Sequence, residues 1–121
     1  MTRLQGKVDK GWGWEDIFVS NDKYCGKLLF FFKDSRFSMH FHKEKHETWR
    51  VVSGRFKLEI INTLDASISE EILYPGSTTT IEPLTPHRLS CLEEGTILEI
   101  STPDSVEDSY RVMPGDSQKK D

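Results

Sequence analysis

Short runs of β-branched and aromatic residues, separated by polar turn residues, repeat along most of the chain. This pattern is typical of an all-β sandwich or barrel. Turn signals such as Pro75-Gly76 and Glu94-Gly95 fall between the runs. The expected strands are Glu15–Val19, Tyr24–Lys33, Arg36–His42, Glu47–Ser53, Arg55–Asn62, Ser67–Tyr74, Ser77–Glu82, His87–Glu93 and Thr96–Ser101.

Helical patterning is absent from the sequence, apart from a segment at Val106–Val112 that predicts at most a short turn of helix. Asp116–Asp121 is polar and lacks an apolar anchor, so we expect it to fray into solvent. With 121 residues the chain fits one domain, whose core is expected from about Gly11 to Gly115. The predicted fold class is therefore all-β.

Charge and composition narrow the classes of partner. The net charge of −4 provides no basic stripe, so we expect no nucleic-acid partner. No apolar leader is present, and no stretch approaches the roughly 20 apolar residues that cross a bilayer, which predicts no membrane association and a cytoplasmic location. Cys25 and Cys91 lie outside any Cys-x-x-Cys spacing and are expected to be small buried hydrophobes.

The expected strand Tyr24–Lys33 contains five consecutive apolar residues, from Leu28 to Phe32. Because side chains alternate between the two faces of a strand, this run places apolar residues on both faces. A strand buried on both faces in so short a chain indicates that a second subunit covers it. The sequence therefore predicts a homodimer.

Four candidate metal ligands lie at strand starts and ends. His40 and His42 share one strand face, about 7 Å apart at their backbones, so one ion can reach both imidazoles. Glu47 begins the next expected strand after a short loop, and His87 follows the turn Pro83–Pro86. Three imidazoles and one carboxylate suit one divalent zinc, iron, manganese, nickel or cobalt ion and leave positions open for water or substrate.

These ligands stand at the spacings of two known motifs. His40, His42, Glu47 and Gly54 match the first motif of the cupin superfamily, and the interval from Gly76 to His87 matches the second motif in length. The sequence therefore resembles the cupins, and the resemblance implies a double-stranded β-helix, or jelly-roll barrel. Two motif glycines are replaced, by Asp34 and Leu84.

A narrower resemblance covers the chain from about Gly11 to Gly115. Gly11–Trp14, Glu47–Gly54 and His87–Leu89 are similar to segments of the type II mannose-6-phosphate isomerases and related single-domain cupins. This resemblance implies a metal-dependent aldose–ketose isomerase acting on a sugar or sugar phosphate. Two alternatives are a metal-dependent dioxygenase and a non-catalytic sugar-binding cupin, because one scaffold hosts many functions.

Isomerisation of a sugar needs a base that moves a proton beside a carbonyl. Glu99 interrupts the apolar run Ile97–Ile100, where a carboxylate is costly to bury, so it is the first candidate for the base. The alternative is that Glu99 points to solvent from the outer face of a sheet that is buried on one face only. Glu47 and His46 are the next candidates, although His46 is expected to point away from the metal ligands, into an exposed loop.

Cationic and aromatic residues are candidates for binding the substrate. Arg36 shares strand parity with His40 and His42, which predicts a side chain pointing into the barrel. Arg88 and Lys27 are further candidates for contacting a phosphate, with a solvated surface position as the alternative. Trp49 is a candidate to stack on a sugar face, with core packing as the alternative.

Overall fold

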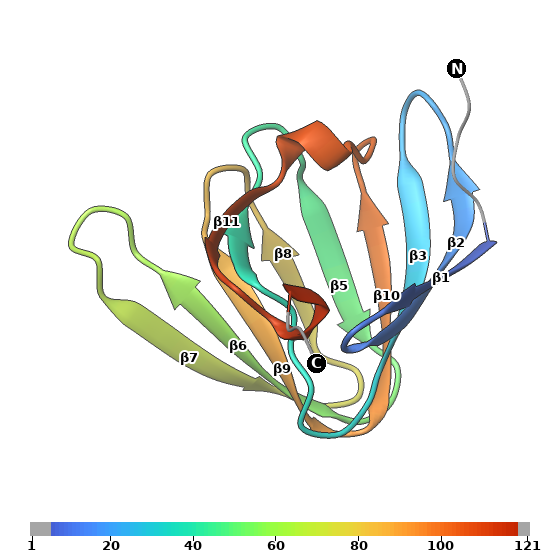
Figure 1. Cartoon of the computed structure of the whole chain (residues 1–121), viewed down its shortest axis with the longest axis horizontal. Helices are drawn as coiled ribbons and strands as arrows, with labels where there is room; N and C mark the ends of the chain where they lie inside the picture. Colours follow the sequence, from blue (N-terminus) through green and yellow to red (C-terminus); the bar gives the residue numbers. More distant parts are fainter. Residues whose placement is uncertain (1–5, 119–121) are drawn as a thin grey trace.

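Two antiparallel sheets form the facing walls of a barrel in this computed structural model, which describes residues 6–118 (Figure 1). The first sheet has the order β1 (Gly6–Lys10), β2 (Gly13–Ser20), β3 (Cys25–Phe31), β10 (Gly95–Ser101), β5 (Glu47–Val51) and β8 (Thr78–Ile81). The second has the order β11 (Tyr110–Met113), β4 (Met39–Phe41), β9 (His87–Glu93), β6 (Arg55–Ile61) and β7 (Ile68–Leu73). The all-β jelly-roll prediction is confirmed.

Each expected strand is present, and most end within two residues of the predicted bounds. The exception is Arg36–His42, which shortens to β4. Arg36 makes only an isolated bridge to Ser90, and the chain becomes a regular strand at Met39. The alternation of side chains along β4 therefore does not extend back to Arg36. The side chain of Arg36 is exposed, so the expectation that it points into the barrel is wrong.

The sequence pattern missed the two outermost strands of the described chain, β1 and β11. β1 is mostly exposed and polar, and it pairs with β2 along its whole length. β11 pairs with β4 and occupies the second half of the segment expected to be a helical turn. The first half does form a short 3-10 helix, η1 (Val106–Asp108). No helix among residues 6–118 is long and apolar enough to cross a membrane.

The C-terminal segment is anchored as far as residue 118, in a second 3-10 helix, η2 (Asp116–Gln118). The backbone N–H of Arg36 donates to Asp116 Oδ2 (2.9 Å), and that of Gly11 donates to Ser117 Oγ (3.1 Å). Figure 1 shows this segment ending beside β1. The expected fraying is therefore wrong for residues 116–118, and residues 119–121 lie outside the described part.

An aromatic core fills the space between the sheets. Trp12 stacks on Phe31 with 4.4 Å between ring centroids, and Phe31 meets Phe56 edge to face at 5.3 Å. Cys25 and Cys91 are buried and free, as predicted. The buried hydrophobic cluster comprises Trp12, Leu29, Phe31, Trp49, Val51, Phe56, Leu58, Leu73, Ile81, Leu89, Cys91 and Ile97.

Register in the first sheet brings polar residues together inside the barrel. Glu99 on β10 lies opposite Lys27 on β3 and opposite Trp49 on β5. Since all three side chains are buried, they form one row across the interior wall. On the other face of β3, Leu28 and Phe30 are half-buried, so this strand does carry apolar residues on both faces.

Two of the three described non-glycine residues with a positive φ stand at positions of the cupin motifs. Asp34 and Leu84 both have φ of 66°, a region that L-residues other than Asn and Asp rarely visit. They are the two residues that replace glycines of the cupin motifs. The backbone N–H of Leu84 donates to the carbonyl of His42 (2.6 Å), so this turn links the two ligand-bearing segments.

Candidate functional site

Three histidines converge inside the barrel. His40 lies on β4 directly opposite His87 at the start of β9, and His42 follows the end of β4. One ring nitrogen from each histidine lies within 4.8 Å of those of the other two. The ring centroids are 4.6 Å apart for His40 and His87 and 5.0 Å apart for His40 and His42. The structure therefore brings the three predicted histidine ligands together.

Backbone carbonyls fix the tautomer of each imidazole. Each Nδ1 donates to a carbonyl oxygen: His40 to Ser38 (2.7 Å), His42 to Asp108 (2.6 Å) and His87 to Thr85 (2.8 Å). Because a carbonyl only accepts hydrogen bonds, each Nδ1 carries the proton and each Nε2 keeps its lone pair. This outer-shell arrangement is the usual way in which proteins orient histidine ligands of a metal ion.

Glu47 lies next to this triad. Its Oε2 is 3.4 Å from His42 Nε2, and its Oε1 accepts a hydrogen bond from Trp49 Nε1 (2.7 Å). Glu47 Oε2 and His87 Nε2 are both buried and make no hydrogen bond with the described residues. Buried polar atoms without partners are costly, and a metal ion would satisfy both of these. The three imidazoles can thus hold one divalent ion, and Glu47 lies beside them next to His42.

Burial keeps the imidazoles neutral. It lowers the pKa of His40 to about 4 and the pKa of His87 to about 3, and it also lowers the pKa of His42. All three are therefore uncharged at pH 7, which is the form that binds a metal ion.

Two buried carboxylates, Glu47 and Glu99, titrate as a coupled pair. Burial, reinforced by the Glu99 carboxylate, raises the pKa of Glu47 to about 8. Burial also acts to raise the pKa of Glu99, but the ammonium groups of Lys45 and Lys27 outweigh it and lower that pKa to about 2. Burial thus favours the neutral form of Glu47, and the two ammonium groups favour the ionised form of Glu99.

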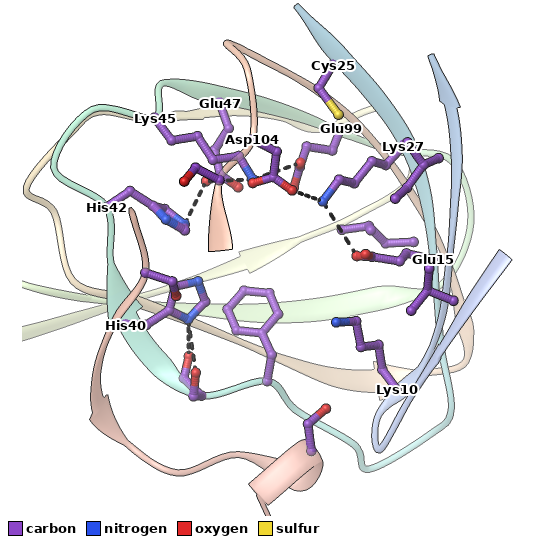
Figure 2. Close-up of a pocket in the computed structure, with 18 of the residues that line it drawn as sticks. Lys10, Glu15, Cys25, Lys27, His40, His42, Lys45, Glu47, Glu99 and Asp104 are labelled. Atoms are coloured by element: carbon purple, nitrogen blue, oxygen red, sulfur yellow. Dashed lines mark hydrogen bonds and ion pairs between the residues drawn. The ribbon is translucent and has the colours of Figure 1, made fainter. Parts of the chain in front are cut away.

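Glu99 belongs to a buried network of alternating charges (Figure 2), which we call the charged cluster: Glu15, Lys27, Lys45, Glu47, Glu99 and Asp104. Lys45 Nζ lies 3.1 Å from Glu99 Oε2, 3.3 Å from Asp104 Oδ1 and 3.8 Å from Glu47 Oε2. Lys27 Nζ lies 2.5 Å from Asp104 Oδ2 and 3.7 Å from Glu15 Oε2. Every ammonium group in the cluster is thus paired.

The charged cluster and two of the histidines line one cavity of about 830 Å³, a volume typical of small-molecule sites. His40 and His42 lie on one side of it, with Lys27, Glu99 and Glu15 on the other (Figure 2). Glu99 thus points inward, as expected for a candidate base, and not to the outer face. Lys27 also lines the cavity, as a substrate-binding role requires.

Asp108 shapes the loop between His42 and Glu47, and sequence reasoning missed it. Its carboxylate accepts the backbone N–H groups of Lys43 (2.8 Å), Glu44 (3.1 Å) and Lys45 (3.0 Å). Its own carbonyl accepts the Nδ1 proton of His42. Successive N–H groups that surround one anion form a backbone nest, which holds this loop in place.

Lys45 and Asp104 were also missed. Lys45 stands two residues before Glu47, and residues two apart in an extended chain point to the same face. This spacing was the only signal in the sequence for the inward position of Lys45. Asp104 and Asp108 lie between β10 and β11, where no strand periodicity predicts direction.

The structure places two predicted substrate-binding arginines away from the cavity. Arg36 is exposed and makes backbone contacts with η2. Arg88 pairs with Glu59 through Nε (3.1 Å) and Nη2 (3.2 Å), because it alternates with the inward-facing His87 on β9. Neither arginine lines the cavity, which corrects their assignment to substrate binding there.

Trp49 is 1% exposed and packs in the core, so it cannot stack on a sugar in the cavity. Its indole N–H instead contacts Glu47 and Glu99 (2.7 and 3.3 Å), where it orients the carboxylate pair. Trp49 thus takes the alternative position, in the core. His46 is exposed, as predicted, and lies 4.0 Å from Glu82.

Comparison with known proteins gives matches in structure only. No protein-family profile matches the chain, and no curated protein matches it in sequence. A search of solved structures finds the capsular polysaccharide assembling protein CapF from Staphylococcus aureus, with TM-score 0.77 and 17% identity over 93% of this chain. It also finds an RmlC-like cupin from Shewanella frigidimarina NCIMB 400, with TM-score 0.67 and 16% identity over 86% of each chain.

Oxalate decarboxylase from Lactobacillus farciminis is a further structural match, with TM-score 0.77 and 14% identity over 89% of this chain. The present chain covers about a third of the length of CapF and of the decarboxylase, with 33% and 34% of those chains matched. These likenesses establish a cupin fold for the chain. Together with the three converging histidines, they define a cupin barrel with a candidate metal site.

The depressed histidine pKa values predict acid sensitivity of the metal-free protein. The unfolded imidazoles take up protons below about pH 6.5, whereas folded His40 and His87 resist protonation until about pH 4 and 3. Stability is therefore retained above pH 6.5 and falls as the pH drops from 6.5 towards 4. Urea unfolding with a chelator present measures this, and His40→Gln with His87→Gln should flatten the slope. An unchanged slope in that variant would contradict the assignment.

Proposed function

We propose that this cupin is a metal-dependent aldose–ketose isomerase acting on a sugar or sugar derivative, similar in chemistry to mannose-6-phosphate isomerase. One observation carries the proposal. Three imidazoles with free Nε2 atoms lie beside a buried carboxylate pair, and His40 and His42 line a cavity large enough for a small molecule. An ion site, a proton-transfer group and room for a substrate thus occur together.

The charged groups in the cavity wall support an isomerase. Around the triad the lining carries the lysines and carboxylates of the charged cluster, with Arg111 further along the wall. These charged groups suit a polar substrate with several hydroxyls, whereas the apolar part of the wall, which includes Trp12, Leu29 and Phe37, is also consistent with a dioxygenase. A non-catalytic sugar-binding cupin is consistent with the same lining and is separated from an isomerase by the exchange assay below.

Each group has a defined role in this proposal. His40, His42, His87 and Glu47 hold one divalent ion. When bound, the ion polarises the carbonyl and hydroxyl oxygens of the substrate. Glu99 takes the proton from the carbon beside the carbonyl. Lys45, 3.1 Å away, keeps this carboxylate ionised and fixed in position, at the cost of lowering its pKa and hence its strength as a base.

Replacement of both His40 and His42 by alanine should abolish metal binding, because each supplies one of the converging ring nitrogens. Elemental analysis after dialysis against zinc, manganese, iron, nickel or cobalt measures the metal content. His46→Ala is the matched control, since His46 is exposed in the adjacent loop and should leave the metal content unchanged. Equal metal content in the double variant and the wild type would rule out the site.

Glu99→Gln tests the proton transfer. The amide keeps the shape of the side chain but cannot take up the proton, so exchange of the substrate C2 proton with solvent should fall by roughly 100-fold or more. Exchange is followed by NMR in heavy water against a panel of sugars and sugar phosphates. Glu59→Gln on the outer face of β6 and β9 is the control and should exchange at the wild-type rate.

Two outcomes of that assay count against the proposal. If Glu99→Gln exchanges as fast as the wild type, Glu99 is not the base. If the wild type exchanges no sugar proton with any of the metals, the isomerase proposal fails, and a dioxygenase or a sugar-binding cupin takes its place.

We also propose that the protein is a homodimer formed through the outer face of the first sheet. Apolar side chains gather there on β2, β3 and β10, and Phe18, Phe32 and Ile100 are about half exposed. One row across this face has the order Asp16, Leu28, Leu98, Arg50. A two-fold axis between the leucines would place Asp16 of one copy opposite Arg50 of the other, so the row is self-complementary.

Charge reversal tests this dimer. Asp16→Arg and Arg50→Asp should each weaken the dimer, because each places like charges opposite one another. The double variant restores opposite charges and should recover the dimer. Sedimentation equilibrium at micromolar concentration measures all four proteins. A monomeric wild type, or a double variant as weak as the single ones, would contradict the proposed interface.

A further inference from the structure

Asp104 bridges two buried ammonium groups. One of its carboxylate oxygens lies 2.5 Å from Lys27 Nζ, and the other lies 3.3 Å from Lys45 Nζ. The two lysine side chains come from opposite ends of the cluster, on β3 and on the loop before β5, and are 7% and 6% exposed. We call this pair of ammonium groups the lysine clamp.

Asp104 differs from its partners in the charged cluster. It lies in the segment between β10 and η1, outside the regular strands, and its side chain is 35% exposed. Lys27 and Lys45 also have other partners, Glu15 and Glu99 respectively, on the strands of the barrel wall. The clamp would therefore stay in place, with its lysines still paired, if the Asp104 side chain moved out.

From this arrangement we infer that the lysine clamp is a binding site for the carboxylate of a substrate, and that Asp104 occupies it as an internal stand-in. The bridging group is a planar monoanion with one oxygen on each ammonium, which is the geometry that an incoming carboxylate would reproduce. The substrate class is then a hydroxy acid or sugar acid, with its carboxylate in the clamp.

The carboxylate site stands on its own geometry, but the position of the rest of the substrate rests on the proposed function, because it requires a metal ion at the histidines. Glu47 Oε2 lies 3.8 Å from Lys45 and 3.4 Å from His42, so the clamp adjoins the histidine triad. A molecule held by its carboxylate could therefore present a hydroxyl or carbonyl oxygen to the histidine side of the cavity. With a divalent ion bound, the positive charges of the two lysines and the ion would equal the negative charges of Glu15, Glu47, Glu99 and Asp104. A monocarboxylate that took the place of the Asp104 carboxylate in the clamp would keep this charge balance.

Glycolate, the smallest hydroxy acid, is the probe, and glycolamide is its uncharged counterpart. The dissociation constant is obtained from the rise in melting temperature with ligand concentration at constant ionic strength. Asp104→Asn removes the internal competitor, so it should bind glycolate at least about 10-fold more tightly than the wild type. Glycolamide should bind neither protein measurably.

Further variants locate the bound carboxylate. Adding Lys27→Met to Asp104→Asn should remove the gain in glycolate affinity. Adding Lys10→Met should preserve it, because Lys10 lines the same cavity but is exposed and lies outside the clamp. A gain in affinity is the expected result for Asp104→Asn, and a variant that merely folds poorly would not produce it.

Two results would overturn the inference. One is glycolate binding to Asp104→Asn that is no tighter than binding to the wild type. The other is a gain for inorganic phosphate without a gain for glycolate, which would make the clamp a phosphate site. Running each titration with a chelator and with the metal ion separates this inference from the proposed function. Clamp binding that persists without metal supports the inference even if no metal binds the histidines.

Discussion

Charges buried inside the barrel must be paired, and this requirement constrains the rest of the structure. An unpaired ammonium or carboxylate in such surroundings costs several kcal/mol. Lys27 on β3 pairs with Glu15 and Asp104, and Glu99 on β10 pairs with Lys45, so β3 and β10 must keep the register that holds Lys27 and Glu99 on the inner face. A slip by one residue would turn every side chain of β3 to the other face and expose Lys27. The charges that could serve chemistry thus also specify how the central strands pair.

Strand alternation and ligand spacing predicted much of this protein, for reasons that the structure makes clear. Apolar and polar residues alternate along a strand when one face is buried, so this pattern locates the central strands. It misses β1, which is mostly exposed and is held mainly by pairing to β2. The motif spacing located the histidines because one end of each motif lies on a strand, with His40 on β4 and His87 at the start of β9. Arg36 was misplaced because regular strand geometry begins only at Met39. Asp104 lies in irregular structure, where periodicity carries no information.

Asp34 and Leu84 indicate what the glycines of the cupin motifs contribute. Both positions keep the left-handed conformation that glycine adopts easily, with φ of 66°, although neither residue is glycine. For an L-residue this conformation costs about 1–2 kcal/mol. The surrounding contacts, such as the hydrogen bond from Leu84 to the carbonyl of His42, must offset that cost. The retained feature is therefore the shape of the backbone turn, and the glycine itself is dispensable.

The segment between β10 and β11 contacts both halves of the site. Asp104 fills the lysine clamp, and only four residues later Asp108 holds both the loop before Glu47 and the ring of His42. Displacement of Asp104 would shift the short segment that joins it to Asp108 and, through Asp108, the loop before Glu47. If that displacement altered the loop, the two binding events would be allosterically linked: any factor by which an anion changes the affinity for the ion would be the factor by which the ion changes the affinity for the anion. The barrel would then respond to the two ligands as one cooperative unit.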